Sequence, residues 1–586
     1  MTQTRGHIIR PPHLVKTAGS RQLVVNGKPF LMRAAEVQNS SFSSAEYMRT
    51  KWQSLVDMNI NTVLGAITWE MLEPQEGTFD FVELDEIIKD ARSYGMKLVL
   101  LWFGSYKNGV STYVPDWVKS NPRRFPRAQI RQKTGIAKTA DILSPFHAAS
   151  VAADAAAFKT LMAHLKEFDA SHSTVLMVQV ENEPGCIGDS RDVSVTATQR
   201  FRKPVPSELL HFLRQDCERF HPLLKEFLQD TWSQNTWQKN ESWESVFGSS
   251  PRTDELFMAF HYALYVDQVA KAGASQYSIP LYTNVWLSYS GSDEGDEWPV
   301  VAGGGAIPGG YPSGGAVTQV LDIWLRFAPN LDFIAPDIYL NNYSTTCATY
   351  AQMNSLLFIP EQRRDEHGAR RIWEAFGSHY AIGTAPFGID TTTAEACAFT
   401  RHYALLDQVS ELVLEAHRRP PGTSFGFYFD DIEAVAPPQE STKVVTMCGF
   451  NLRIERAFVL GRAEPACGMI IHLGGDSSKG TFLLIGWGFQ VFFTATDPKS
   501  SFTGILRFEE KLVDPKTREL RTLRVFGGDE SRGGICAVMP NPDPDYGGFP
   551  ICITIPANTM LAECTVYCLP GEEDMREDEG VPNGCS

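Results

Sequence analysis

Two glutamates in this sequence lie in or directly after apolar segments that are typical of buried strands. Glu183 follows the run TVLMVQVEN, and Glu374 lies among aromatic residues in RRIWEAF. Cleavage of a glycosidic bond needs two carboxyl groups, one to protonate the leaving oxygen and one to attack the sugar or activate water. A single glutamate at a strand end is more often a salt-bridge partner. Two of them in such settings favour a paired catalytic role.

Polar and aromatic residues also gather where other apolar runs end. Aromatic rings stack on the C–H faces of sugars, and amides and carboxylates bind hydroxyl groups, so this mixture predicts a sugar site. No Gly-Lys-Ser/Thr follows the glycines of GGGAIPGGYPSGG (303–315), and no HExxH-like cluster occurs among the histidines, so we predict no nucleotide cofactor and no metal. The candidates are Glu36, Asn39, Trp69, Lys107, Asn108, Asn182, Asn284, Trp286, Asp337 and Tyr339.

Strand-like and helix-like segments must bring these residues together. Near-continuous apolar strands that alternate with helices indicate a parallel sheet covered on both faces. Seven clear strands and a weak eighth fit a closed (β/α)₈ barrel of the TIM type, in which active groups lie at the carboxyl ends of strands. An open doubly wound sheet is the alternative. The expected strands are 30–37, 61–68, 97–104, 174–181, 280–286, 332–339, 371–376 and a weak one within 379–390.

The expected helices separate these strands, and the pattern changes near residue 418. Helices are predicted at 45–59, with Ser44 as N-cap, and at 81–95, 151–170 and 394–418. After the sequence RRPPG, short strands and Gly, Pro and Asp turns predict an all-β, sandwich-like domain. The predicted domains are an N-terminal extension (1–22), a catalytic barrel (23–418) with an insertion at about 186–250, a β-rich domain (419–572) and an acidic tail (573–586).

Composition limits the function classes. The 586 residues carry 53 Lys and Arg against 69 Asp and Glu, a net charge of −16, which disfavours nucleic acid and anionic membranes as partners. The 43% hydrophobic content excludes a mainly disordered chain. The N-terminus has no apolar leader and no run is long enough to span a membrane, so we expect a cytoplasmic location. The odd count of 11 cysteines favours buried free thiols. A homo-oligomer is left open.

Several segments together resemble glycoside hydrolase family 35, the β-galactosidases. VQVENEPG resembles the strand-four motif of that family, and NTVLGAITWEMLEPQEGTFDF resembles its strand-two segment. WFGSYKNGVSTYVPDWVK, LSPF, APDIY, PFGID and HLGGDSSKGTFLLIGWGFQVFF resemble the subgroup with a trailing β-rich domain. The resemblance implies Glu183 as general acid/base, Glu374 as nucleophile and Asn182 as the holder of the neighbouring hydroxyl. It also implies sugar contacts at Glu36, Asn39, Lys107 and Asn108.

The sequence therefore predicts a retaining, exo-acting β-glycosidase, first of all a β-galactosidase, that acts on an oligosaccharide or glycoside by double displacement. A β-glucosidase or a transglycosylating β-glucosyl transferase on the same fold is one alternative. A non-catalytic carbohydrate-binding protein is the alternative from another class.

Overall fold

The computed structural model describes residues 10–132, 134–232, 241–289, 304–430, 442–457, 465–475, 479–539, 541 and 558–571. The chain divides into two compact units. Of the described residues, the first unit contains 10–15, 23–363 and 383–397, and the second contains 16–22, 364–382 and the chain from 398 onward.

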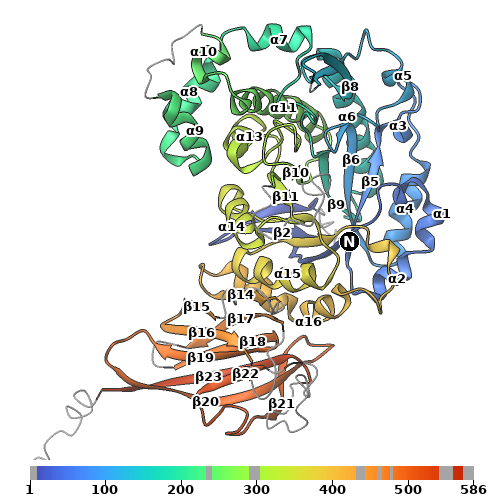
Figure 1. Ribbon diagram of the computed structural model, residues 1–586. Helices are drawn as coiled ribbons and strands as arrows, with labels where there is room; N and C mark the ends of the chain where they lie inside the picture. Colours follow the sequence, from blue (N-terminus) through green and yellow to red (C-terminus); the bar gives the residue numbers. More distant parts are fainter. Residues whose placement is uncertain are drawn as a thin grey trace, which may run out of the picture. The chain divides into compact units, whose positions relative to one another are not determined.

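The first unit is built on eight parallel strands that form a nearly closed barrel (Figure 1). Strands that follow one another in the chain are neighbours in the sheet, and the last pairs with the first through Gly383 and Met32. Between β11 and β12 the ring is completed by one bridge, in which the Ile338 amide donates to the Glu361 carbonyl at 2.9 Å. The strands are β4 (Met32–Glu36), β5 (Thr62–Thr68), β6 (Lys97–Lys107), β9 (Val175–Asn182), β10 (Leu281–Trp286), β11 (Phe333–Asp337), β12 (Ile359–Gln362) and β13 (Gly383–Pro386).

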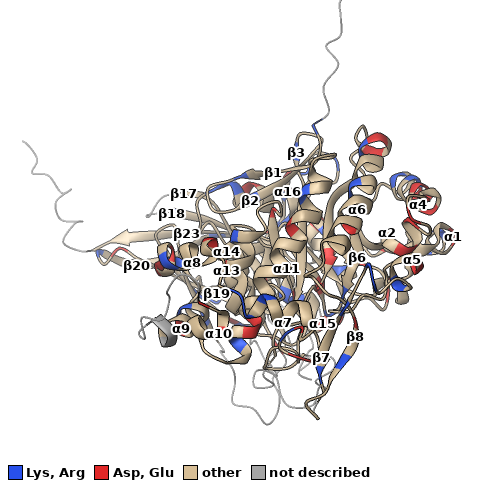
Figure 2. Cartoon of the chain, turned by 90° about the horizontal axis from the view of Figure 1, so that it is seen from above, with Lys and Arg blue, Asp and Glu red and all other residues tan. Residues whose placement is uncertain are grey.

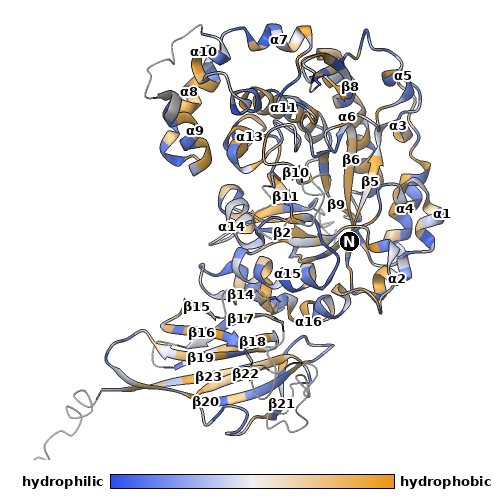
Figure 3. Ribbon diagram, viewed as in Figure 1, coloured by the Kyte–Doolittle hydropathy of each residue, from blue (hydrophilic) through white to orange (hydrophobic). Residues whose placement is uncertain are grey.

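The barrel strands are apolar because both of their faces are covered. Every residue of β5 and β9 is buried, and Figure 3 draws β5 and β6 largely in the hydrophobic colours. This pattern is the one expected of a parallel sheet with a filled interior and helices outside. The predicted barrel is confirmed, and the open sheet is excluded.

Helices fill the connections between the strands. Ser44 caps the first of them, as predicted, since its side chain accepts a hydrogen bond from the Tyr47 amide at 3.1 Å. The helices are α1 (Ala45–Arg49), α2 (Trp52–Asp57), α3 (Trp69–Leu72), α4 (Val82–Ser93), α5 (Asp116–Lys119), α6 (Ala148–Asp169), α11 (Pro251–Ala274), α13 (Leu321–Phe327) and α14 (Tyr343–Asn354). The β9–α11 connection adds α7 (Val195–Phe201), α8 (Ser207–Gln215), α9 (Pro222–Trp232) and α10 (Trp243–Phe247).

The expected strand at 371–376 is wrong. These residues lie in helix α15 (Glu366–His379), and the seventh strand is the short β12. Asp365 caps the helix by accepting from the Gly368 amide at 3.0 Å. The apolar residues Ala369, Ile372, Trp373 and Phe376 are spaced for one face of a helix, a pattern that the aromatic run concealed.

The second unit contains α15, α16 (Phe399–Arg418) and two antiparallel sheets that share one core. The predicted all-β C-terminal region is thus confirmed. The first sheet has the order β14 (Ser424–Phe429), β17 (Ala466–Gly475), β18 (Lys479–Trp487), β23 (Leu561–Pro570), β20 (Ser500–Val513) and β21 (Leu520–Val525). The second has the order β15 (Thr442–Met447), β16 (Phe450–Arg456), β19 (Phe489–Ala495) and β22 (Cys536–Met539).

Charged residues of both signs are interspersed over the described chain (Figure 2). None of the helices described by the structure is both long enough and apolar enough to cross a membrane.

Helix α15 packs directly on β14 because a glycine leaves room for its backbone. A Cβ added at Gly426 would lie 1.8 Å from the Trp373 carbonyl oxygen and 3.0 Å from the Cα of Glu374. A Cβ at Gly377 would lie 2.5 Å from the Gly426 amide nitrogen. The helix that carries Glu374 is therefore held against the β-rich sheets by backbone contact.

We predict that Gly426→Ala lowers the free energy of unfolding by about 3 kcal/mol or more, because overpacking would force helix and strand apart. Gly528→Ala is the matched control, since its Cβ would meet nothing within 4 Å, and we expect a change below about 0.5 kcal/mol. Denaturant unfolding of the two variants checks this. Equal stability in both would contradict the close packing of α15 on β14.

Candidate active site

Glu183 leaves the end of β9 in a strained backbone conformation. Glu181 and Glu183 both have positive φ angles, 63° and 48°, which cost on the order of 1–3 kcal/mol each in residues other than glycine. The Glu181 carboxylate is anchored by the backbone amide of Tyr106 at 2.7 Å, and the Glu183 amide donates to Asn284 Oδ1 at 2.9 Å. These bonds hold the strand end in the turn that presents the Glu183 side chain.

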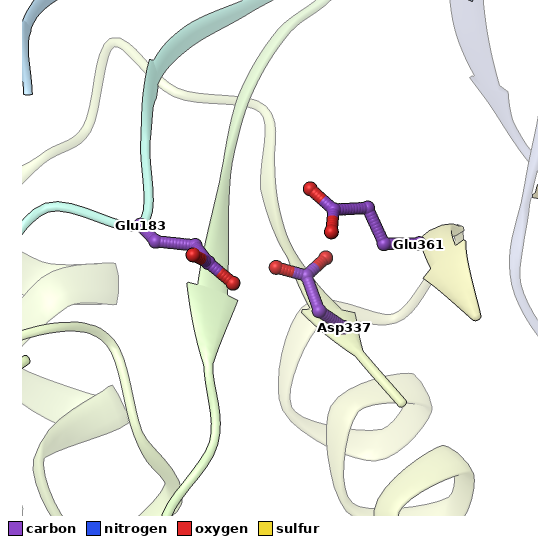
Figure 4. A group of neighbouring side chains, drawn as sticks. All are labelled: Glu183, Asp337 and Glu361. Atoms are coloured by element: carbon purple, nitrogen blue, oxygen red, sulfur yellow. The ribbon is translucent and has the colours of Figure 1, made fainter. Parts of the chain in front are cut away.

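Three carboxyl groups meet where β9, β11 and β12 end. One carboxylate oxygen from each of Glu183, Asp337 and Glu361 lies within 4.8 Å of the other two, and the three residues are only 7%, 3% and 6% exposed. In Figure 4 the Asp337 carboxyl lies between the other two, with one oxygen toward each. Three carboxylates cannot all ionise at this spacing in a buried setting, so protons must remain among them.

Hydrogen-bond donors concentrate on Glu361. Its Oε1 accepts from the side-chain amides of Asn182 and Asn284, each at 3.3 Å, and its Oε2 accepts from the Tyr339 hydroxyl at 3.0 Å. Burial and the neighbouring Glu361 carboxylate raise the pKa of Tyr339 well above its ordinary value, so this hydroxyl stays a donor. Three donors on one carboxyl group stabilise its anion.

Lys107, at the end of β6, is a cation that interacts electrostatically with this cluster. Its side chain is buried, with the ammonium 4.9 Å from the centre of the Phe103 ring. Burial alone would lower its pKa, but the carboxyls of Glu361, Glu183, Glu36 and Asp337 raise it overall. Lys107 therefore remains charged and compensates one buried carboxylate.

The other carboxyls hold their protons more firmly than usual. Burial, and then the charge of Glu361, raises the pKa of Glu183 to about 7, while Lys107 and a hydrogen bond with Asp337 oppose the rise. Burial, and then Glu361 and Glu183, raises the pKa of Asp337 well above its ordinary value. Burial, and then Glu361, does the same for Glu36, against the effect of Lys107. A protonated Glu183 beside an anionic Glu361 is the pairing of an acid with a nucleophile.

Most of the predicted sugar contacts lie near this cluster. Asn182 and Tyr339 bind Glu361, and Glu36 and Lys107 interact electrostatically with it. Both carboxylate oxygens of Glu36 and the Oδ1 of Asn182 are buried and accept no hydrogen bond from the described residues. These atoms are free to meet hydroxyl groups.

The remaining predicted contacts differ in their exposure. Asn39 and Trp286 are half-buried, and the Asn39 Oδ1 has no hydrogen-bond partner in the described part of the chain. Asn108 is exposed in a left-handed turn with φ 53°. Trp69 is fully buried, donates to Glu73 Oε2 at 2.7 Å and packs edge-on against Trp117. Trp69 therefore belongs to the packing around α3 rather than to an accessible sugar platform.

Glu374 was predicted as the nucleophile because it was expected at the end of the seventh strand. It lies instead in the middle of α15, in the second compact unit, with its Oε1 3.4 Å from His379 Nε2. The carboxyl groups that face Glu183 belong to Asp337 and Glu361. The basis for assigning Glu374 is therefore removed, and Glu361 occupies the strand position.

The sequence held a signal for Glu361 that the strand assignment missed. Both Asp337 and Glu361 follow a proline directly, in IAPD and FIPE, and each closes a short apolar run. Asp337 was placed at the site rim because the expected strand 332–339 carries it. The run LLFIP before Glu361 is shorter and was not among the expected strands.

The same three carboxyl groups form the one set, among the residues that the structure describes, whose oxygens lie close enough together to hold a metal ion. A cation there would compete with the charged Lys107 and with the donors already bound to Glu361 and Asp337. Some of the carboxylate oxygens that a metal ion would need are thus already occupied by hydrogen-bond donors.

Two family models match parts of the chain. Residues 41–261 match the model of glycoside hydrolase family 42, described as beta-galactosidase, and residues 399–537 match a domain of unknown function (DUF5597). The first match covers less than half of the chain and includes Glu183 but not Glu361. It supports a β-galactosidase-like glycosidase, whereas the resemblance to family 35 is not confirmed. No curated protein sequence matches the chain.

Three solved glycosidase structures show a distant similarity to this chain. The beta-galactosidase from Bacillus circulans sp. alkalophilus has 15% identity and a TM-score of 0.43, over 66% of this chain and 57% of that one. The beta-galactosidase from Marinomonas ef1 has 13% identity and a TM-score of 0.44, over 66% of this chain and 62% of that one. The catalytic domain of beta-amylase from Paenibacillus polymyxa has 13% identity and a TM-score of 0.42, over 63% and 96%. At these scores we draw no inference from the three structures.

The raised pKa of Glu183 predicts a pH-dependent cost to folding. A carboxyl that titrates at 4.5 when unfolded and at about 7 when folded contributes stability below pH 4.5, and this contribution is lost as pH rises through 7. Glu183→Gln cannot ionise. Its free energy of unfolding relative to wild type should therefore rise by about 3 kcal/mol between pH 4.5 and pH 8. Urea unfolding at both pH values measures this, and a difference that stays constant with pH would contradict the buried, protonated state of Glu183.

Proposed function

We propose that the chain is a retaining β-glycosidase, acting first of all on terminal β-galactosides, with Glu183 as acid/base and Glu361 as nucleophile. The observation that carries the proposal is the approach of these two carboxyl groups, one oxygen of each lying within 4.8 Å of the other, with three donors on Glu361. Retaining enzymes hold their two carboxyls about 5–5.5 Å apart, whereas inverting enzymes need about 6.5–9.5 Å to admit a water.

In the first step Glu361 attacks the anomeric carbon and Glu183 gives its proton to the glycosidic oxygen. The bond from sugar to aglycone breaks, and the aglycone leaves as an alcohol. Asn182, Asn284 and Tyr339 keep the Glu361 carboxyl in one orientation, which limits the freedom that the reacting group must lose.

In the second step Glu183, now an anion, takes a proton from water, and the resulting hydroxide attacks the same carbon. The bond to Glu361 breaks, so two inversions give net retention. If a sugar hydroxyl replaces the water, the same step transfers the glycosyl group. The β-galactoside preference rests on the family-model match, and the β-glucosidase and transferase alternatives share all of this chemistry.

We expect the sugar to meet Glu36, Asn182 and Lys107. Glu36 has two buried oxygens and Asn182 has one to which no described residue donates, and the buried side chain of Lys107 adds an ammonium group. Buried polar atoms without partners cost free energy until water or a ligand binds them. Sugar hydroxyls supply both donors and acceptors and are suited to these positions.

We predict that Glu361→Gln lowers kcat/KM on a nitrophenyl β-galactoside by about 10⁴-fold or more, because the attacking anion is lost. Glu374→Gln is the matched control, with the same chemical change in helix α15, and should keep wild-type activity within about threefold. Both are assayed at equal concentrations of folded protein, with circular dichroism as the check. Full activity in Glu361→Gln would exclude Glu361 as the nucleophile, and a comparable loss in Glu374→Gln would return that role to Glu374.

We predict that Glu183→Gln lowers kcat/KM by about 10²–10⁴-fold on a substrate with a poor leaving group, and by much less on one whose leaving group needs no proton.

Added azide should restore turnover of the activated substrate in Glu183→Ala and give the β-glycosyl azide. In Glu361→Gly azide should replace the nucleophile and give the α-glycosyl azide. NMR of the products distinguishes the two anomers, and exchanged outcomes would show that the two roles are reversed.

A panel of nitrophenyl glycosides, assayed with and without sugar acceptors, identifies the preferred sugar and shows whether the glycosyl group passes to water or to an acceptor.

A further inference from the structure

Asp337 is the carboxyl group of the cluster that double displacement leaves without a role. It ends β11, is 3% exposed and lies between Glu183 and Glu361 (Figure 4). Its Oδ2 accepts from the Asn284 side-chain amide at 2.7 Å. Its Oδ1 is buried, and no group of the described chain donates a hydrogen bond to it.

The distribution of donors decides which carboxyls carry protons. Asn182, Asn284 and Tyr339 all donate to Glu361, so this group is the favoured anion. Among the described residues, Asp337 accepts one side-chain hydrogen bond, from Asn284 on Oδ2, and its Oδ1 accepts none. Where two carboxyl groups approach each other in a buried site, a proton between them turns repulsion into a hydrogen bond.

Charge balance also indicates that Glu361 is the anion and that the other carboxyls keep their protons. Within the described part of the chain, Lys107 is the one cation that interacts with all four buried carboxyls, so full ionisation would leave three uncompensated negative charges. A buried charge without a partner is strongly disfavoured and is removed by protonation. With Glu361 anionic against Lys107, the remaining carboxyls are most stable with their protons bound. The titratable groups of the described chain that interact electrostatically with Asp337 come from seven elements: Glu183 after β9, Glu361 from β12, Glu36 from β4, Lys107 from β6, Tyr282 from β10, Tyr339 after β11 and Tyr350 from α14.

We propose that Asp337 keeps its proton throughout turnover and donates it in a hydrogen bond to Glu183, as a positioning residue for the acid/base steps of the function proposed above. In the first step the Glu183 O–H bond breaks and its proton leaves with the aglycone, while the Asp337 O–H bond stays intact. The Asp337 hydroxyl then stabilises the new Glu183 carboxylate. When Glu183 takes a proton from water, the resting state is restored.

The test compares two uncharged replacements of similar size. Asp337→Asn can accept from Asn284 and donate to Glu183, as the protonated acid does. Asp337→Leu can do neither. The basic limb of the kcat/KM profile reports loss of the Glu183 proton in the free enzyme.

For Asp337→Asn we expect a basic limb within about 0.3 pH units of wild type. For Asp337→Leu we expect a limb higher by about one pH unit, because the Glu183 anion loses a hydrogen bond. If Asp337 were ionised, both replacements would remove a negative charge and move the limb to lower pH. That result, or a Leu variant with an unchanged limb, would overturn the proposal.

A measurement without turnover separates this proposal from the proposed function. The wild-type protein is labelled with ¹³C at the aspartate side-chain carboxyls and titrated by NMR from pH 4 to pH 8. The Asp337 resonance, identified by its loss in Asp337→Asn, should remain at the protonated position at pH 7. If that variant does not fold, a wild-type spectrum with no protonated aspartate carboxyl at pH 7 still refutes the proposal. If the wild type cleaves no glycoside but this resonance stays protonated, the proposed function fails and the proton assignment stands.

Discussion

Four buried carboxyl groups that share one buried ammonium are the constraint on which the rest of the site depends. Glu36, Glu183, Asp337 and Glu361 each lose hydration, and Lys107 can balance only one of them. The protein meets this cost by placing three donors on Glu361 and leaving protons on the others. The same arrangement separates the charge states that an acid and a nucleophile need, so the cost of burial and the proposed chemistry have one origin.

The barrel makes this crowding possible. Each charged group comes from a different strand end, and only the closed ring of β4 to β13 brings those ends to one rim. The bridge from the Ile338 amide to the Glu361 carbonyl fixes β12 beside β11, and with it the approach of Glu361 to Asp337. The strained turn at Glu181 and Glu183 is kept by buried hydrogen bonds from neighbouring strands, as expected where backbone strain serves a site.

The sequence predicted the barrel because long apolar strands alternate with helices. Six of the eight expected strands agree with the observed strands to within about three residues at each end. It predicted Glu183, Glu36, Lys107, Asn182 and Tyr339 at the rim because each ends or follows such a run. It missed Glu361 because β12 has four residues and a proline, too little for a period-two pattern to register. It favoured Glu374 because aromatic and β-branched residues in RRIWEAF imitate a strand. The Asp365 cap and the packing of α15 on β14 through Gly426 decide for the helix, and that packing depends on residues distant in sequence.

The most direct test of the central claim, that Glu361 is the nucleophile opposite Glu183, is to locate a trapped glycosyl group. The protein is incubated with a 2-deoxy-2-fluoro-β-galactoside that bears a good leaving group, which slows the second step more than the first. Trypsin then separates the candidates, since Glu361 lies in the peptide 327–363 and Glu374 in the peptide 372–401. The structure predicts one added fluorosugar on residues 327–363, localised to Glu361 by fragmentation. A label on residues 372–401 would contradict the assignment and restore Glu374.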